Sequence, residues 1–462
     1  MDGSSLNYLR KITVSRKLAR PLRQGRMRTV GSLAQQRRVR NPLYSGGRGR
    51  KSKKGGGLET ERGDGGGRYR LLVVASHPVQ YMAPIFRRMA KHPRLDLQVA
   101  YCSLRGAEEG HDPEFGRQVK WDVPLLDGYA WTHVPNKSSG AESFWGLNNP
   151  GLKRIIGEGK FDAVLCYTGY MRASFWIARK AAKRAGTAFL FGADATTLEP
   201  RDGRAWKKWI KQIIWPILFG LADQVVVPSS GTHDLMRSLG IPEERITLTP
   251  YSVDNDWWMA QAAGVDRSAE RAKLGLREEE RVVLFCAKLQ PWKRPMDLLQ
   301  AFAKAHVANA KLIFAGEGPQ RGDLEAETIR LGIADCVKFL GFINQLSLPI
   351  IYKIVDLMVL PSSYEPFAVV VNEAMCCGCP VMASDKVGAA RDLVQPVAPD
   401  FVFPAGNVDA LAEKLAAALQ NRERLLQLKE TALAHIKTWS PERNIEATIQ
   451  AVEIAVHRKR SS

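Results

Sequence analysis

Two lysines stand in a loop where they could act on a phosphorylated ligand. Lys288 and Lys293 are five residues apart in the segment 287–295, which follows a short apolar run typical of a buried strand. Lysines at this spacing can converge on a diphosphate and stabilise charge on a leaving group. Lysines are the norm on solvated loops, so the pair alone is a weak signal and an ordinary surface loop is the favoured interpretation.

The segment 360–375 adds two carboxylates, Glu365 and Glu373. Pro366 suits the first turn of a helix, so the pattern predicts a helix that begins there. The first amides of such a helix would form an anion site. These amides belong to Phe367, Ala368 and Val369. Two carboxylates along the helix fit different parts of one elongated ligand, and the alternative is a capping Glu followed by a surface Glu.

A glycine-rich turn, Gly316-Glu317-Gly318-Pro319, follows the next apolar run. It misses the dinucleotide-binding fingerprint because its third glycine comes one place late. The following strand also ends at Phe339-Leu340-Gly341 without an acidic residue, so we do not expect a nicotinamide enzyme. We expect the glycines to let a ligand approach the backbone closely.

The elements that position these loops are short apolar runs alternating with helical stretches. This alternation predicts parallel sheets covered by helices, with ligands bound beyond the carboxyl ends of the strands. The regularity breaks at 251–275, so we expect two α/β units joined by a hinge. Strands are expected at 70–76, 95–102, 162–167, 188–192, 224–228, 282–287, 311–315, 337–340, 357–361, 381–384 and 401–403. Helices are expected at 82–91, 295–308, 321–332, 368–377, 407–420 and 440–458.

The formal charge of +20 is concentrated in the first 70 residues. They hold 19 Lys and Arg against 4 Asp and Glu, and the rest of the chain has a net charge of only +5. Residues 1–68 are rich in glycine and arginine and poor in large apolar residues, which predicts a disordered extension. A dispensable extension is the favoured interpretation. A nucleic-acid or acidic-lipid arm and an organelle transit peptide are alternatives, and nucleic-acid binding is not expected elsewhere.

Membrane and metal signals are weak. No apolar run reaches 18 residues, and no signal peptide is evident, so we expect a cytoplasmic protein with reduced cysteines. Cys376 and Cys379 lack the partners of a zinc site and are expected to be buried. The basic, aromatic stretch 204–215 indicates either a helix with a solvated basic face or an interfacial helix at the inner membrane face. Asp254-Asn255-Asp256 is expected to form a turn rather than a metal site.

Together, the loops resemble the nucleotide-binding domain of family 4 glycosyltransferases, which are retaining enzymes with the GT-B fold. The resemblance covers roughly residues 282–395 and is looser at 221–230 and 250–254. Its motifs are Lys288…Lys293, Gly316-Glu317-Gly318-Pro319, Phe339-Leu340-Gly341, Glu365-x7-Glu373 and Ser384-Asp385-Lys386-Val387-Gly388.

This resemblance implies an α/β protein with two Rossmann-like domains whose parallel sheets face each other across a cleft. The acceptor-side domain would cover 69–255, and the nucleotide-sugar domain would cover 270–438. A helix at 439–462 would cross back toward the first domain.

The implied activity is transfer of a sugar from a nucleotide diphosphate sugar, with retention, to a polysaccharide, lipid-linked or small-molecule acceptor. Lys288 and Lys293 would hold the diphosphate, Glu365 would contact the sugar and Glu373 the ribose. The other expected donor-binding residues are Gly316, Gly318, Gly341, Phe342, Phe367, Ala368 and Val369. No metal or other cofactor is expected, because lysines and a helix N-terminus would supply the positive charge. A nucleotide-sugar epimerase of the same fold and a non-catalytic sugar-nucleotide-binding protein are the alternatives.

The sequence departs from the family pattern in ways that affect these expectations. Lys288 replaces a usual Arg, so a bidentate phosphate contact becomes a point charge. Ala368 replaces a usual Gly and would crowd the backbone beside the sugar. Asp194 stands where many relatives carry His. We expect His77, Tyr81 and Asp194 on the acceptor side, although a satisfied loop His and a helix-capping Asp would also explain two of them.

Overall fold

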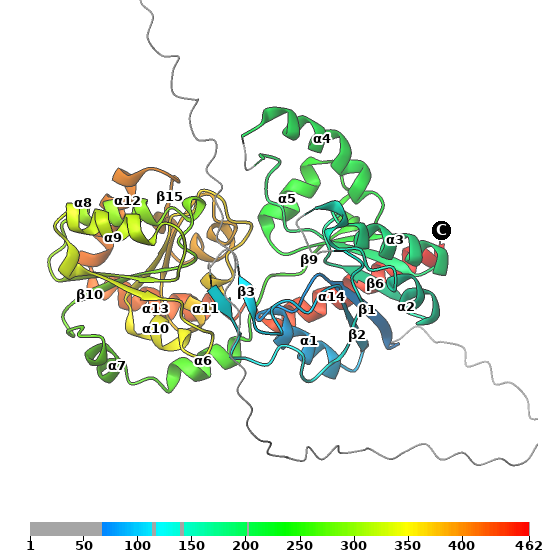
Figure 1. Cartoon of the computed structure of the whole chain (residues 1–462), viewed down its shortest axis with the longest axis horizontal. Coiled ribbons are helices and arrows are strands. Elements are labelled where there is room, and N and C mark those ends of the chain that lie inside the picture. Colours follow the sequence, from blue (N-terminus) through cyan, green and yellow to red (C-terminus); the bar gives the residue numbers. More distant parts are fainter. Residues whose placement is uncertain (1–66, 113–116, 139–142, 201–202, 462) are drawn as a thin grey trace, which may run out of the picture. The chain divides into compact units, whose positions relative to one another are not determined.

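The computed structural model describes residues 67–112, 117–138, 143–200 and 203–461. The expected extension over 1–68 therefore lies outside the described residues, except for its last two. The described residues fold around two parallel sheets, each accompanied by helices (Figure 1). Within these ranges, no helix is both long enough and apolar enough to cross a membrane.

The first sheet has seven parallel strands. Val73 in the centre pairs with Val99 on one side and Leu165 on the other. Its central strands are apolar because helices cover both faces. In spatial order the strands are β5 (Ala130–His133), β2 (Leu95–Tyr101), β1 (Tyr69–Ala75), β6 (Ala163–Cys166), β7 (Ala188–Gly192), β8 (Gln224–Val227) and β9 (Ile246–Leu248). The edge strands β5 and β9 were not expected, because they are short and β5 is mostly exposed.

Two groups of helices cover the first sheet. One face packs against α1 (Met82–Lys91) and the C-terminal helix α14 (Pro441–Ser461), which inserts Ile445, Ile449 and Val452 into that core. The helices of the other face are α2 (Leu152–Glu158), α3 (Ala173–Ala185), α4 (Ala205–Phe219) and α5 (Ser230–Ser238). A small antiparallel pair, β3 (Gly110–Asp112) and β4 (Arg117–Val119), stands apart from the sheet. The last helix of the chain therefore completes the core of the first domain.

The second sheet has six parallel strands around one core. Cys376 and Cys379 are buried in this core, as expected. The strands in spatial order are β12 (Val337–Gly341), β11 (Ala310–Ala315), β10 (Arg281–Cys286), β13 (Leu357–Leu360), β14 (Val381–Ser384) and β15 (Val402–Phe403). The helices are α8 (Pro295–Ala305), α9 (Arg321–Arg330), α10 (Leu348–Ile354), α11 (Val370–Cys376), α12 (Val408–Gln420) and α13 (Arg422–Ile436).

The expected hinge at 251–275 contains two helices, α6 (Asn255–Ala263) and α7 (Arg267–Lys273). Asp254 caps α6 by accepting a hydrogen bond from the Trp257 amide. Arg88 of α1 forms ion pairs with both Asp254 and Asp256. The Asp-Asn-Asp sequence is therefore a helix cap held by an arginine. No group of three or more His, Cys, Asp or Glu suited to a metal occurs in the described part of the chain.

Candidate functional site

A cavity of about 530 Å³ lies beside the ends of the second sheet, and we name it the lysine pocket. Lys288 follows β10, Gly316 follows β11 and Glu365 follows β13. The carboxyl ends of parallel strands thus bring distant loops together. The residues that line this pocket include Tyr81, Trp121, Asp194, Tyr251, Lys288, Lys293, Gly316, Phe342, Gln345, Glu365, Phe367, Ala368, Val369 and Glu373.

Lys293 and Glu365 form an ion pair in this pocket. Lys293 Nζ donates a hydrogen bond to Glu365 Oε2, and both side chains are more than four-fifths buried. The amide of Ser363 donates to the carbonyl of Trp292 at 2.8 Å, which joins the two loops next to the pair. A cation and a carboxylate are thereby fixed at one wall, where they can contact neighbouring parts of one ligand.

A third loop determines where Glu365 lies. The Glu365 amide donates to Lys386 O at 3.1 Å, and the Gly388 amide donates to Glu365 O at 3.0 Å. A Cβ atom on residue 388 would lie only 2.0 Å from Pro366 O. Glycine is therefore required at 388 if the loop that carries Glu365 is to keep this position.

The expected helix start at Pro366 is wrong, because α11 begins at Val370. Ala368 has φ +83°, a left-handed conformation that a continuous helix excludes. The Val371 amide donates to Ala368 O at 3.0 Å. Among the described residues, none accepts a hydrogen bond from the amides of Ala368 and Val369. These two pocket-lining amides can therefore still bind an anion, although Pro366 does not open the helix.

Gly316 and Gly318 pack directly against the backbone of another loop. A Cβ on residue 316 would lie 2.0 Å from Ala287 O, and one on 318 would lie 2.5 Å from Leu289 O. The backbone of the Lys288 loop therefore fills the space beside both glycines, and a side chain at either position would push this loop away. In the described structure, Gly316 and Phe342 line the lysine pocket, whereas Gly318 and Gly341 do not.

Glu373 is almost completely buried at the inner side of the pocket. Tyr352 donates a hydrogen bond from its hydroxyl to Glu373 Oε2 at 3.0 Å, and the Gln345 side chain also hydrogen-bonds to this carboxyl group. Burial raises the pKa of Glu373 to about 7, and these two hydrogen bonds only partly oppose that effect. Glu373 therefore keeps its proton to a higher pH than an exposed glutamate does, and its carboxylate form can accept hydrogen bonds from ligand hydroxyls.

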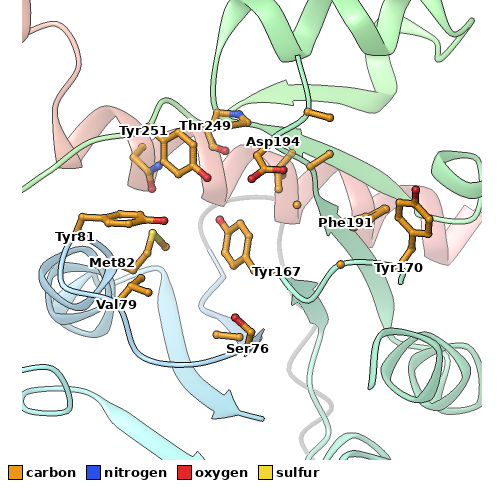
Figure 2. A pocket seen from close by; sticks show the side chains of 18 of the residues that line it. Ser76, Val79, Tyr81, Met82, Tyr167, Tyr170, Phe191, Asp194, Thr249 and Tyr251 are labelled. Atoms are coloured by element: carbon orange, nitrogen blue, oxygen red, sulfur yellow. The ribbon is translucent and has the colours of Figure 1, made fainter. Parts of the chain in front are cut away.

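A second cavity, of about 400 Å³, lies beside the first sheet, and we name it the aromatic pocket. It shares Tyr81, Asp194 and Tyr251 with the lysine pocket. In Figure 2 the rings of Tyr81, Tyr167 and Tyr251 are turned toward a common space next to Asp194. The aromatic residues of this lining are Tyr81, Phe86, Tyr167, Tyr170, Phe191, Trp215, Phe219 and Tyr251.

The three residues expected on the acceptor side differ in position. Tyr81 and Asp194 line both pockets, whereas His77 lines only the aromatic pocket. Burial and the positive charge of Arg105 lower the pKa of His77, so its ring is neutral at pH 7. Burial, reinforced by the negative charge of Asp194, raises the pKa of Tyr81 to about 12. The Tyr81 hydroxyl therefore remains protonated and can act as a hydrogen-bond donor.

Sequence reasoning missed several residues of the lysine pocket. Trp121 of the first domain lies near Phe342, with ring centroids 6.0 Å apart. Asn344 holds this contact in place by donating a hydrogen bond to Lys120 O at 2.8 Å. No motif surrounds Trp121, so only the three-dimensional fold reveals it. For Tyr251, the sequence signal was its place in the Pro250–Asp254 hinge.

Comparison with known protein families agrees with this geometry. Residues 266–435 match the family Glycosyl transferases group 1, and residues 78–252 match the Glycosyl transferase 4-like domain. An uncharacterized glycosyltransferase of Methanocaldococcus jannaschii is 32% identical over 190 residues, covering 41% of this chain and 48% of that protein. The D-inositol 3-phosphate glycosyltransferase of Geodermatophilus obscurus is 30% identical over 248 residues, covering 51% of this chain and 53% of that protein. The chain thus spans about half the length of these curated relatives.

Comparison with solved structures confirms the expected fold. The Anabaena protein HepE, crystallised in complex with UDP and glucose, superimposes with a TM-score of 0.63. The sequence identity is 18%, and the match covers 84% of this chain and 100% of HepE. Two parallel-sheet domains with this likeness constitute the GT-B fold. The chain therefore combines a glycosyl transferase 4-like domain, at residues 78–252, with a glycosyl transferases group 1 domain, at residues 266–435.

Proposed function

We propose that this protein transfers a sugar from a nucleotide diphosphate sugar to an acceptor hydroxyl, with retention of anomeric configuration. One observation carries the proposal: Lys288, Lys293, Glu365 and Glu373, from separate loops and one helix, all line the lysine pocket. Two cations next to two carboxylates suit a ligand that carries both phosphates and hydroxyls. HepE, which shares the fold, has been crystallised with UDP and with UDP-glucose.

In this proposal the lysines stabilise the diphosphate as it leaves. The bond between the anomeric carbon and the diphosphate oxygen breaks, and the acceptor oxygen forms a bond on the same face of the sugar. The acceptor proton passes to the departing diphosphate oxygen. Lys288, Lys293 and the amides of Ala368 and Val369 supply positive charge where negative charge develops.

The remaining groups orient the two substrates. Glu365 contacts hydroxyls of the transferred sugar, Glu373 accepts hydrogen bonds from the ribose, and Phe342 faces the base. The acceptor, a glycan or a lipid-linked sugar, enters through the aromatic pocket. Asp194 and Tyr81 lie where the two pockets meet, so they can orient the attacking hydroxyl.

Labelled nucleotide sugars test this proposal. We expect Lys293→Ala and Glu365→Ala each to lower sugar transfer or donor hydrolysis at least about 100-fold, since each removes a group that acts on developing charge. Lys304→Ala is the matched control, because Lys304 forms its ion pair with Asp409 on the exposed surface of the same domain.

Three results would contradict the proposal. Full turnover by Lys293→Ala and by Glu365→Ala would show that neither side chain takes part in the reaction. A changed sugar that stays on the nucleotide would identify an epimerase. Nucleotide binding without any turnover, across a panel of donors and acceptors, would identify a binding protein.

A further inference from the structure

Helix α4 exposes an apolar face that nothing in the proposed reaction uses. Trp206, Trp209, Ile213 and Ile217 are 56%, 64%, 48% and 66% exposed. Their spacing of three, four and four residues places them on one side of the helix. Ile214 beside them is also exposed. We call these five residues the α4 face.

The opposite side of α4 fixes how the helix is oriented. Trp215, Leu218 and Phe219 are buried in the core of the first domain. The helix lies at the periphery of that domain (Figure 1). Because the buried residues fill the core, α4 cannot rotate to hide its exposed tryptophans and isoleucines.

A solvated basic face was one expectation for α4, but its lysines contact neighbouring side chains instead of forming such a face. Lys207 and Lys211 lie over the rings of Trp206 and Trp215, and Lys208 pairs with Glu199. The outward side is therefore the apolar one, flanked by cations. From Arg204 to Phe219 the segment carries four cationic residues and no Asp or Glu.

We propose that the α4 face docks on an anionic lipid bilayer. Tryptophan favours the boundary between lipid headgroups and acyl chains, and isoleucine favours the acyl region. The flanking cations complement anionic headgroups, whereas a second copy of the same cationic helix would be repelled. A bilayer therefore fits both the apolar character and the charge of this surface better than self-association does.

The docking has a consequence that rests on the proposed function. Trp215 and Phe219 of the same helix line the aromatic pocket. A bilayer held against the outer side of α4 would lie next to this pocket, so a membrane-bound acceptor could reach Asp194 without leaving the lipid surface.

Vesicle sedimentation with the full chain tests the docking. Vesicles of phosphatidylcholine with 30% phosphatidylglycerol should bind the protein, and pure phosphatidylcholine should bind it more weakly. We expect the double variant Trp209→Ser/Ile217→Ser, and separately Ile213→Ser, to weaken binding to the anionic vesicles at least tenfold. Ile329→Ser is the matched control, because Ile329 is 73% exposed on α9 of the second domain.

Binding through the basic residues 1–68 gives a different pattern. It would disappear in high salt and would be insensitive to the α4 variants. Equal vesicle binding by the wild type and the variants would overturn the proposal. A wild-type dimer that the double variant converts to a monomer would also overturn it, since the α4 face would then be a protein interface.

The two proposals can fail separately. Vesicle binding is measured without a nucleotide sugar, and donor hydrolysis is measured without vesicles. Because the α4 face does not line the lysine pocket, the double variant should keep wild-type donor hydrolysis in vesicle-free buffer.

Discussion

Glu373→Gln should make the free energy of unfolding less sensitive to rising pH. The folded protein holds the Glu373 pKa at about 7, against an ordinary value of 4.5. Between these two values the folded state binds a proton that the unfolded state has lost, so the free energy of unfolding falls as pH rises. Each pKa unit corresponds to about 1.4 kcal/mol, so complete ionisation of the buried group costs about 3 kcal/mol. Glutamine cannot ionise and should avoid this cost.

Urea unfolding at pH 5 and pH 8, followed by circular dichroism, measures the effect. The stability of Glu373→Gln relative to the wild type should rise by about 2–3 kcal/mol between the two conditions. Glu158→Gln is the control, because Glu158 lies exposed at the end of α2. A relative stability that is the same at both pH values would refute the reasoning, since Glu373 would then have an ordinary pKa.

Three further substitutions test the positioning of the loops and of the second domain. Ala368→Gly should raise the free energy of unfolding by about 0.5–1 kcal/mol, because glycine relieves the backbone strain of the left-handed conformation at φ +83°. A lower free energy of unfolding, measured by urea denaturation, would contradict this prediction. Gly388→Ala should reduce sugar transfer at least tenfold, because the alanine methyl group would clash with Pro366 O beside Glu365. Unchanged transfer kinetics would show that the loop can move without disturbing the site. Arg271→Met should lower the free energy of unfolding by about 3 kcal/mol, because Arg271 donates hydrogen bonds to the buried carbonyls of Ile354 and Glu280. Arg330→Met, on the exposed side of α9, is the control, and a smaller loss of stability for Arg271→Met than for Arg330→Met would refute this prediction.

The strands and the lysine pocket were largely readable from the sequence. Buried parallel strands such as β10 and β14 are continuous apolar runs, so their positions depend on local composition. Lys288, Lys293 and Glu365 follow such runs, and parallel topology brings the ends of these strands together. These residues could therefore be assigned to one site without knowledge of the packing.

Features that depend on distant contacts could not be read in this way. The delayed start of α11 follows from the conformation of Ala368 and from the contact between Gly388 and Pro366, which the local sequence does not reveal. Trp121 reaches the pocket because its segment is held against the second domain by hydrogen bonds from Asn344 to Lys120 O and from the Leu346 amide to Asp122. Which side of α4 faces outward depends on which of its residues pack into the core. The periodicity of the sequence alone allowed either side to be buried.

The place of α14 in the first domain has a consequence for synthesis of the chain. The last strand of the first sheet ends at Leu248, but the residues of α14 that cover one of its faces lie between Ile445 and Val456. Translation proceeds at about 5–20 residues per second, so roughly 200 further residues take about 10–40 seconds. During that time the nascent first domain lacks α14 and exposes the part of its apolar sheet surface that this helix covers in the described structure. A ribosome-bound chain stopped before α14 should therefore engage chaperones more strongly than the complete chain does.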